Sequence, residues 1–158
     1  MKRVYLSLGS NLGDRRAHLR EAVERLTTQG VGVLRESSIY ESEPRDVREQ
    51  PWFLNQILEA ETDLLPRQLL ARTQKIEREM GRKRVVDKGP RVIDIDIVLF
   101  GNAAVRAPEL EIPHPRMRER RFVLEPLAEL APDLRHPVSG RTMRALLEAV
   151  LDQIVRKT

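Results

Sequence analysis

The chain alternates between short segments with a two-residue apolar period and longer segments with a helical period. Apolar residues at alternate positions or in short runs predict strands at residues 4–8, 31–42, 52–62 and 93–100. Helical spacing predicts helices at residues 14–29 and from Pro66 to Gly81, with the proline in the first turn and the glycine as the stop. Two further helical stretches are predicted around residues 123–130 and 143–155.

The order of these elements is strand, helix, strand, strand, helix, strand, followed by two helices. This order is typical of a ferredoxin-like α+β sandwich with an antiparallel βαββαβ sheet, here with extra C-terminal helices. We expect helices on one face of the sheet, with the other face free to carry a site. The 158 residues suit a single domain over positions 1–158.

The last predicted strand lies in GPRVIDIDIVLFG, residues 89–101, and contains two acids among apolar residues. Side chains alternate along a strand, so Ile93, Ile95 and Ile97 point to the core while Asp94 and Asp96 point to the other face. One interpretation is a half-solvated strand. The other is a carboxylate pair that shares a cation, because Mg²⁺ takes carboxylate oxygens and completes its shell with water and nucleotide phosphates.

The composition favours an anionic partner, either a phosphorylated small molecule or a nucleic acid. Lys and Arg number 28 against 24 Asp and Glu, which gives a net charge of +4 and a pI of about 9.8. There is no cysteine, which excludes thiolate nucleophiles and Cys-ligated metals. No apolar run approaches the roughly 20 residues of a membrane span, and the N-terminus turns polar quickly, so we expect a cytoplasmic protein with no membrane contact.

Basic residues flank the acidic strand on both sides. They are Arg82, Lys83, Arg84, Lys88, Arg91, Arg116, Arg118, Arg120 and Arg121. Arginine matches phosphate oxygens bidentately, although most single arginines of this kind are ordinary solvated charges.

Other features of the sequence bear on a phosphate or nucleotide site. No GxxxxGK[ST] motif occurs, and GSNLGD from Gly9 is interpreted as a strand-to-helix turn rather than a phosphate cradle. His114, held between two prolines, is a candidate for binding phosphate or base.

Five blocks of the sequence together resemble the 6-hydroxymethyl-7,8-dihydropterin pyrophosphokinase family of folate biosynthesis. They are SLGSNLGDR, SSIYESEP, QPWFLNQILEAET, GPRVIDIDIVLFG and IPHPRMRERRFVLEPLAELAP, which occur in order between residues 6 and 134. The resemblance implies transfer of pyrophosphate from ATP to the hydroxymethyl oxygen of the reduced pterin, with release of AMP.

The resemblance also implies the residues of the site. Asp94 and Asp96 would bind two Mg²⁺ ions, and Arg82, Arg84 and Arg91 would contact the phosphates, with Arg82 and Arg91 acting in catalysis. Further ATP-binding positions are Gln74, Glu77, Ile97, His114 and Arg120. The positions matching the pterin site are Ser42, Pro44, Phe53, Asn55 and Phe122.

Two other functions are alternatives to pyrophosphate transfer. A nucleic-acid-binding ferredoxin-like module would display a run of aromatics on its central strands, which this sequence lacks, so we expect no nucleic-acid partner. A metal-dependent nucleotidyltransferase would release pyrophosphate instead of AMP. We expect a monomer.

Overall fold

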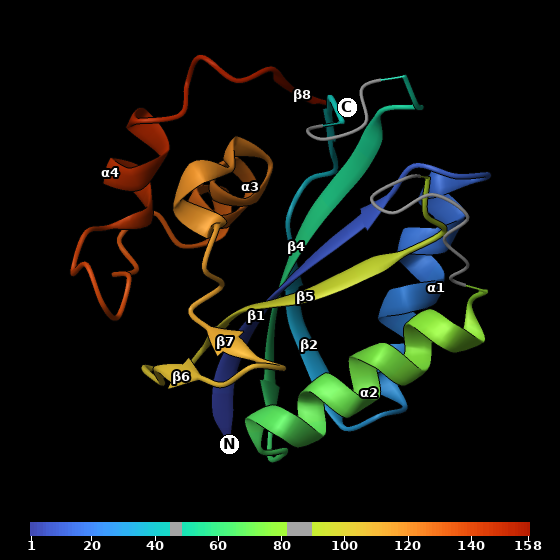
Figure 1. The fold of residues 1–158 in the computed structure, drawn as a ribbon, viewed down its shortest axis with the longest axis horizontal. Coiled ribbons are helices and arrows are strands. Elements are labelled where there is room, and N and C mark those ends of the chain that lie inside the picture. The colour runs from blue at the N-terminus through green and yellow to red at the C-terminus, as the bar shows by residue number, and fades with distance from the viewer. Residues whose placement is uncertain (45–48, 82–89) are drawn as a thin grey trace.

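The computed structural model describes residues 1–44, 49–81 and 90–158, and its centre is an antiparallel sheet (Figure 1). The strand order is β5-β1-β4-β3-β8, and β2 also pairs with β4. The strands of this sheet are β1 (Lys2–Ser10), β2 (Val31–Glu36), β3 (Tyr40–Ser42), β4 (Phe53–Thr62), β5 (Asp94–Phe100) and β8 (Val155–Lys157). The helices are α1 (Arg15–Thr27), α2 (Pro66–Glu79), the 3-10 turn η1 (Met117–Glu119), α3 (Arg121–Leu130) and α4 (Met143–Glu148). A separate small hairpin comprises β6 (Val105–Arg106) and β7 (Glu111–Ile112).

The predicted ferredoxin-like α+β class is confirmed, and the predicted second strand is divided in two. Both β2 and β3 pair with β4, on either side of a break at residues 37–39. The break stays attached to β4 because the backbone N–H of Ser37 donates to the Ile57 carbonyl, while the Ser37 hydroxyl accepts the Ile57 N–H at 2.9 Å. These bonds let the strand bend without leaving backbone groups unpaired.

The end of the chain differs from the prediction of a helix over residues 143–155. Helix α4 stops at Glu148, and residues 155–157 form strand β8 against β3. Arg121 holds the segment after the helix, because its guanidinium donates to the carbonyls of Leu151 (2.9 Å) and Gln153 (2.8 Å). These tertiary hydrogen bonds hold the segment out of the helix and outweigh its local helical preference.

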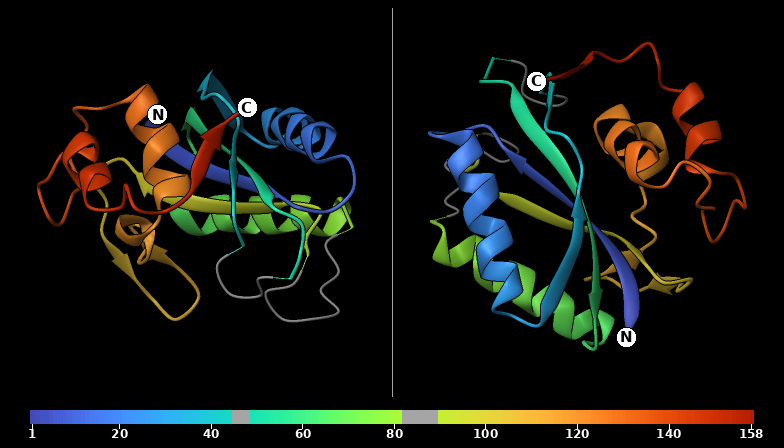
Figure 2. Two further views of the ribbon diagram at one scale, coloured as in Figure 1. Left: turned by 90° about the horizontal axis from the view of Figure 1, so that it is seen from above. Right: turned by 180° about the vertical axis from the view of Figure 1, so that it is seen from behind.

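Helices α1 and α2 cover one face of the sheet, as expected (Figures 1 and 2). Helix α1 begins after Asp14, whose carboxylate accepts the N–H of Ala17 at 3.1 Å. The two helices bury apolar side chains, including Leu19 and Ile76, against the same core that takes the isoleucines of the β5 segment. None of the helices in the described ranges is long and apolar enough to span a membrane.

The opposite face is not free over its whole length, and this part of the prediction is wrong. At one end, Tyr5, Ile57, Val98 and Leu99 form a second core with apolar side chains of α3 and α4. A β-bulge contributes to this core, because Leu6 pairs with Ile97 while Tyr5 pairs with Leu99. Helices α3 and α4 each carry an apolar side that needs burial, and this half of the sheet provides it. The other half of the face remains open.

Candidate active site

The open half of the second sheet face forms a pocket whose floor is β1. In the strand register, Gly9 lies between Asp94 of β5 and Asn55 of β4, and Ser7 lies opposite Asp96. Small side chains in the middle strand therefore leave room between the acids on one side and the amide on the other. The pocket contains about 590 Å³ of space, its open mouth included.

The acidic wall of the pocket confirms the predicted orientation of the β5 side chains. Asp94 and Asp96 both line the pocket, while Ile93, Ile95 and Ile97 are buried in the helix-covered core. Asp94 is largely covered and forms an ion pair with Arg91 at 2.7 Å between Nη1 and Oδ2, whereas Asp96 is exposed. Arg91 Nε is buried and has no hydrogen-bond partner within the described part of the chain. That N–H is well suited to an oxygen of an anionic ligand.

Two phenyl rings face the pocket, and an arginine lies over each of them. The guanidinium carbon of Arg91 is 5.3 Å from the centre of the Phe53 ring, and that of Arg120 is 5.4 Å from the centre of the Phe122 ring. All four side chains line the same pocket. The pocket thus combines surfaces on which a flat ring can stack with cations that can bind phosphate.

Asn55 is the buried amide of the pocket. Its Oδ1 accepts a hydrogen bond of 2.5 Å from the Ser42 hydroxyl, and its side chain reaches the space above Gly9. A Cβ atom at Gly9 would lie 3.3 Å from Asn55 Nδ2 and 3.5 Å from Phe53 Cδ1. The glycine therefore allows both groups to approach the floor of the pocket.

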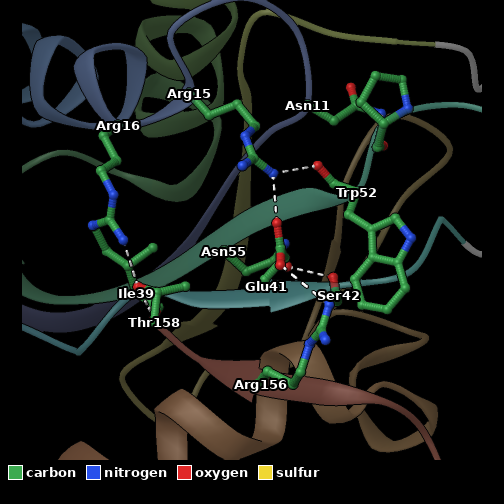
Figure 3. Close-up of polar contacts among 11 residues, drawn as sticks. Asn11, Arg15, Arg16, Ile39, Glu41, Ser42, Trp52, Asn55, Arg156 and Thr158 are labelled. Atoms are coloured by element: carbon green, nitrogen blue, oxygen red, sulfur yellow. Dashed lines mark hydrogen bonds and ion pairs between the residues drawn. The ribbon is translucent and has the colours of Figure 1, made fainter.

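Strand β8 fixes the outer edge of the pocket by pairing with β3, which carries Ser42 (Figure 3). Glu41 of β3 accepts hydrogen bonds from Arg15 of α1 at 3.0 Å and from Arg156 of β8 at 3.4 Å. The guanidinium carbon of Arg156 also lies 4.5 Å from the centre of the Trp52 ring. The segment that follows α4 therefore helps to hold β3 and the start of β4 in place.

His114 lies beside β5, where its backbone N–H donates to the Val98 carbonyl at 3.0 Å. Its Nδ1 accepts the N–H of Arg116 at 3.1 Å, so Nε2 carries the hydrogen of the neutral ring. Burial, followed by the charges of Arg120 and Arg116, lowers the pKa of His114 to about 4. The ring is consequently a neutral hydrogen-bond donor at physiological pH, not a cation.

His114 does not line this pocket, and neither do three other predicted ATP-binding residues. Glu77 of α2 is buried, and its Oε2 accepts the backbone N–H of Ile95 at 2.8 Å. Ile97 is buried in the helix-covered core, and Gln74 lies exposed on α2. The structure thus gives Glu77 a structural partner and does not bring these three side chains to the pocket, so their part in ATP binding stays a prediction.

Among the other predicted residues, Pro44 is buried and lines a neighbouring pocket, which shares Ser42 and Phe122 with the first. Arg82 and Arg84 lie outside the described residues. Ser7 and Gly9 were not predicted as pocket residues, although alternation in VYLSLGS places both opposite the core leucines. Glu43 was not predicted either, and it lines the pocket from a segment without regular alternation.

The fold and the pocket together define a ferredoxin-like α+β protein whose pocket has two half-sites. One half-site contains the two acids and the arginines, and the other contains the two phenyl rings and the amide of Asn55. The family model for 7,8-dihydro-6-hydroxymethylpterin-pyrophosphokinase (HPPK) matches residues 5–132. The chain belongs to this family.

Curated relatives agree with this family. The chain is 50% identical over 128 residues to the 2-amino-4-hydroxy-6-hydroxymethyldihydropteridine pyrophosphokinase of Bacillus subtilis, covering 80% of this chain and 77% of that protein. It is 46% identical over 148 residues to the protein of the same name from Methylorubrum extorquens, covering 93% and 92%. It is 45% identical to the folic acid synthesis protein fol1 of Pneumocystis carinii, covering 97% of this chain but only 21% of the fungal protein.

Solved structures with the same fold include HPPK-DHPS of Plasmodium falciparum in complex with pteroate. The TM-score is 0.76 at 16% identity, and the match covers 94% of this chain and 44% of that one. At this identity the likeness supports the fold alone.

We expect the ring of His114 to titrate with a midpoint near 4, because burial and two neighbouring arginines disfavour its charged form. The pKa is below the ordinary value of 6.5, so the unfolded chain binds the proton first and stability falls as the pH drops from 6.5 towards 4. Two-dimensional NMR of the histidine ring protons, assigned with a His114→Gln variant, measures the midpoint. A midpoint near 6.5 would contradict the burial of the ring.

Proposed function

We propose that the chain transfers pyrophosphate from ATP to the hydroxymethyl oxygen of 6-hydroxymethyl-7,8-dihydropterin, giving AMP and the pterin diphosphate in folate biosynthesis. One observation carries the proposal. A single pocket holds a carboxylate pair and two arginines together with two phenyl rings and a buried amide. These are the groups that a triphosphate and a flat, hydrogen-bonding heterocycle need side by side. The family and the names of the bacterial relatives support the same substrates.

Asp94 and Asp96 would hold the Mg²⁺ ions that accompany ATP. The donor set fits, because hard carboxylate oxygens on one strand face the pocket. Two carboxylates do not complete an octahedral shell, and no cluster of three or more His, Cys, Asp or Glu suited to a metal occurs within the described residues. The remaining ligands would be water and triphosphate oxygens. Bound Mg²⁺ would neutralise the triphosphate and polarise its P–O bonds.

Arg91 and Arg120 are the described cations that would bind the triphosphate. Arg91 holds Asp94 through Nη1 and has a buried, unpartnered Nε–H to offer a phosphate oxygen. His114 would add a neutral Nε2–H donor. Arg82 and Arg84 are proposed to join them on the strength of the family resemblance.

The pterin would lie between the rings of Phe53 and Phe122, with the Asn55 side chain at its edge. Stacking on aromatic faces suits a planar heterocycle, and a buried amide that is already oriented discriminates its donors from its acceptors. Ser42 supplies this orientation through its 2.5 Å hydrogen bond to Asn55 Oδ1. We propose that Pro44, in the adjoining segment, limits the outer side of this site.

In the reaction, the hydroxymethyl oxygen of the pterin forms a bond to the β-phosphorus of ATP. The bond between that phosphorus and the oxygen bridging to the α-phosphorus breaks, so AMP leaves with the bridging oxygen and the hydroxyl proton passes to solvent. The chain itself forms no covalent intermediate in this scheme. Its residues orient the two substrates in line and place arginine charge around the transferred group, which is how proteins accelerate phosphoryl transfer.

The nucleotide product distinguishes this proposal from nucleotidyl transfer. Incubation with Mg²⁺, ATP and the reduced hydroxymethylpterin is expected to give AMP and pterin diphosphate in equal amounts, measured by ion-exchange chromatography and mass spectrometry. Release of ADP, release of pyrophosphate, or turnover that does not depend on the pterin would overturn the proposal. Omission of Mg²⁺ and addition of EDTA test the metal requirement separately.

Asp96→Ala is expected to lower kcat at least about a hundredfold while leaving the fold intact, because it removes an exposed metal ligand from the pocket. Asp94→Ala is expected to do the same and also to release Arg91. The matched control is Asp63→Ala, which changes a carboxylate that is 79% exposed and follows the last residue of β4, at the opposite end of that strand from Phe53. Steady-state kinetics and circular dichroism make the comparison, and near-normal activity of Asp96→Ala would refute the metal assignment.

Gly9→Ala is expected to raise the KM for the pterin about tenfold, because the new methyl would crowd the Asn55 amide and fill space beside Phe53 in a packed site. Gly32→Ala is the control, since its Cβ would meet only ordinary contacts, the nearest at 3.6 Å. Initial rates at saturating ATP measure both variants. An unchanged pterin KM in Gly9→Ala would show that the ring does not bind above this glycine.

The expected monomeric state and cytoplasmic location stay predictions from the sequence.

A further inference from the structure

Asn11, at the end of β1, is fully buried in the GSNLGD turn, and its side chain joins two distant segments of the chain. Its Oδ1 accepts the backbone N–H of Arg91 at 2.7 Å, and its own backbone N–H donates to the Arg91 carbonyl at 3.1 Å. Its Nδ2 donates to Gln50 Oε1 at 2.8 Å and to the Pro51 carbonyl at 3.0 Å. One amide therefore connects residues that lie 39 to 80 positions further along the chain.

The orientation of this amide is fixed by backbone groups of opposite polarity. The Arg91 N–H can only donate and the Pro51 carbonyl can only accept, so the oxygen of Asn11 must face the first and its nitrogen the second. Both amide hydrogens and the oxygen are in use, which makes the side chain a satisfied buried polar group. No shorter or apolar side chain reproduces these three bonds.

The two segments that Asn11 holds end in the two halves of the pocket. Arg91 reaches Asp94 on the phosphate side, and its guanidinium lies over the ring of Phe53, two residues after Pro51. The contact between Arg91 and Phe53 is the place where the two half-sites meet. Asn11 fixes the backbone on both sides of this contact, although it does not itself line the pocket.

We propose that Asn11 is a positioning residue that sets the distance between the arginine for the triphosphate and the ring for the pterin. This inference rests on the proposed function of the pocket. If Asn11 acted only as a structural residue of the turn, its loss would lower stability without separating the two substrates kinetically. If Asn11 is a positioning residue, loss of its amide oxygen and loss of its amide nitrogen affect the two substrates differently. The oxygen holds the backbone of Arg91, and the nitrogen holds the segment that leads to Phe53.

Asn11→Asp separates these effects. The carboxylate keeps an acceptor for the Arg91 N–H but places an oxygen against the Pro51 carbonyl. We therefore expect the KM for the pterin to rise about tenfold or more, while the KM for ATP stays within about threefold of the wild-type value. Asn11→Ala removes all three side-chain bonds, and we expect both KM values to rise about tenfold. Asn102→Asp and Asn102→Ala, in the exposed turn after β5, are the matched controls.

Thermal unfolding of each variant is followed by circular dichroism, and kinetics are measured at least about 20 °C below the lowest midpoint, so that folded protein is compared throughout. If Asn11→Ala does not fold, Asn11→Asp alone decides the matter. Equal changes in both KM values for Asn11→Asp, or no change in either, would overturn the role of Asn11 while the wild type still produced AMP. If the wild type itself failed to produce AMP, the proposed function would fail instead. The role of Asn11 would then be tested by calorimetry, which measures whether Asn11→Asp weakens binding of the pterin while leaving binding of ATP nearly unchanged.

Discussion

The structure depends on how much of one sheet face the C-terminal helices can cover. Strands β1 and β4 have 9 and 10 residues, whereas helices α3 and α4 have 10 and 6 residues. A helix is shorter per residue than a strand, so the two helices cover only one end of the sheet face. Apolar side chains occupy the covered end of this face, whereas small side chains, polar side chains and the ring of Phe53 occupy the remainder. The pocket is the uncovered part of a surface that is otherwise a core, so its floor has the rigidity of paired strands on both sides.

The charges of the site are arranged by this sheet. Two acids at alternate positions of β5 repel each other in the absence of a cation, and the strand tolerates them because the isoleucines that alternate with them are buried in the opposite core. Arg91 partly offsets the charge of Asp94 and is itself held over Phe53. The binding groups for phosphate and for a flat ring therefore share one arginine.

The features of the site that could be predicted from the sequence were local ones. Alternation alone oriented Asp94 and Asp96 correctly, and the order of the elements indicated the fold class. Strand β8 was not predictable, because the partner that holds residues 151–153 outside α4 is Arg121, which lies about 30 positions earlier in the chain. The partners of Asn11 were equally hidden, since they lie 39 and 80 residues away and no periodicity links them. The family resemblance named pocket residues such as Phe53 and Asn55, which composition and spacing would not have selected.

The pairing of β8 with β3 has a consequence for how the molecule folds. Arg156 contacts Glu41 across 115 positions of sequence, and the hydroxyl of Thr158 donates to the Ile39 carbonyl across 119. Closing a loop of that length costs more chain entropy than any hairpin of the sheet, so this pairing gains little until the intervening elements are in place. The outer edge of the pocket thus depends on residues 155–157, and a folding intermediate in which β8 is not yet paired with β3 has the core of the sheet but not the complete binding site.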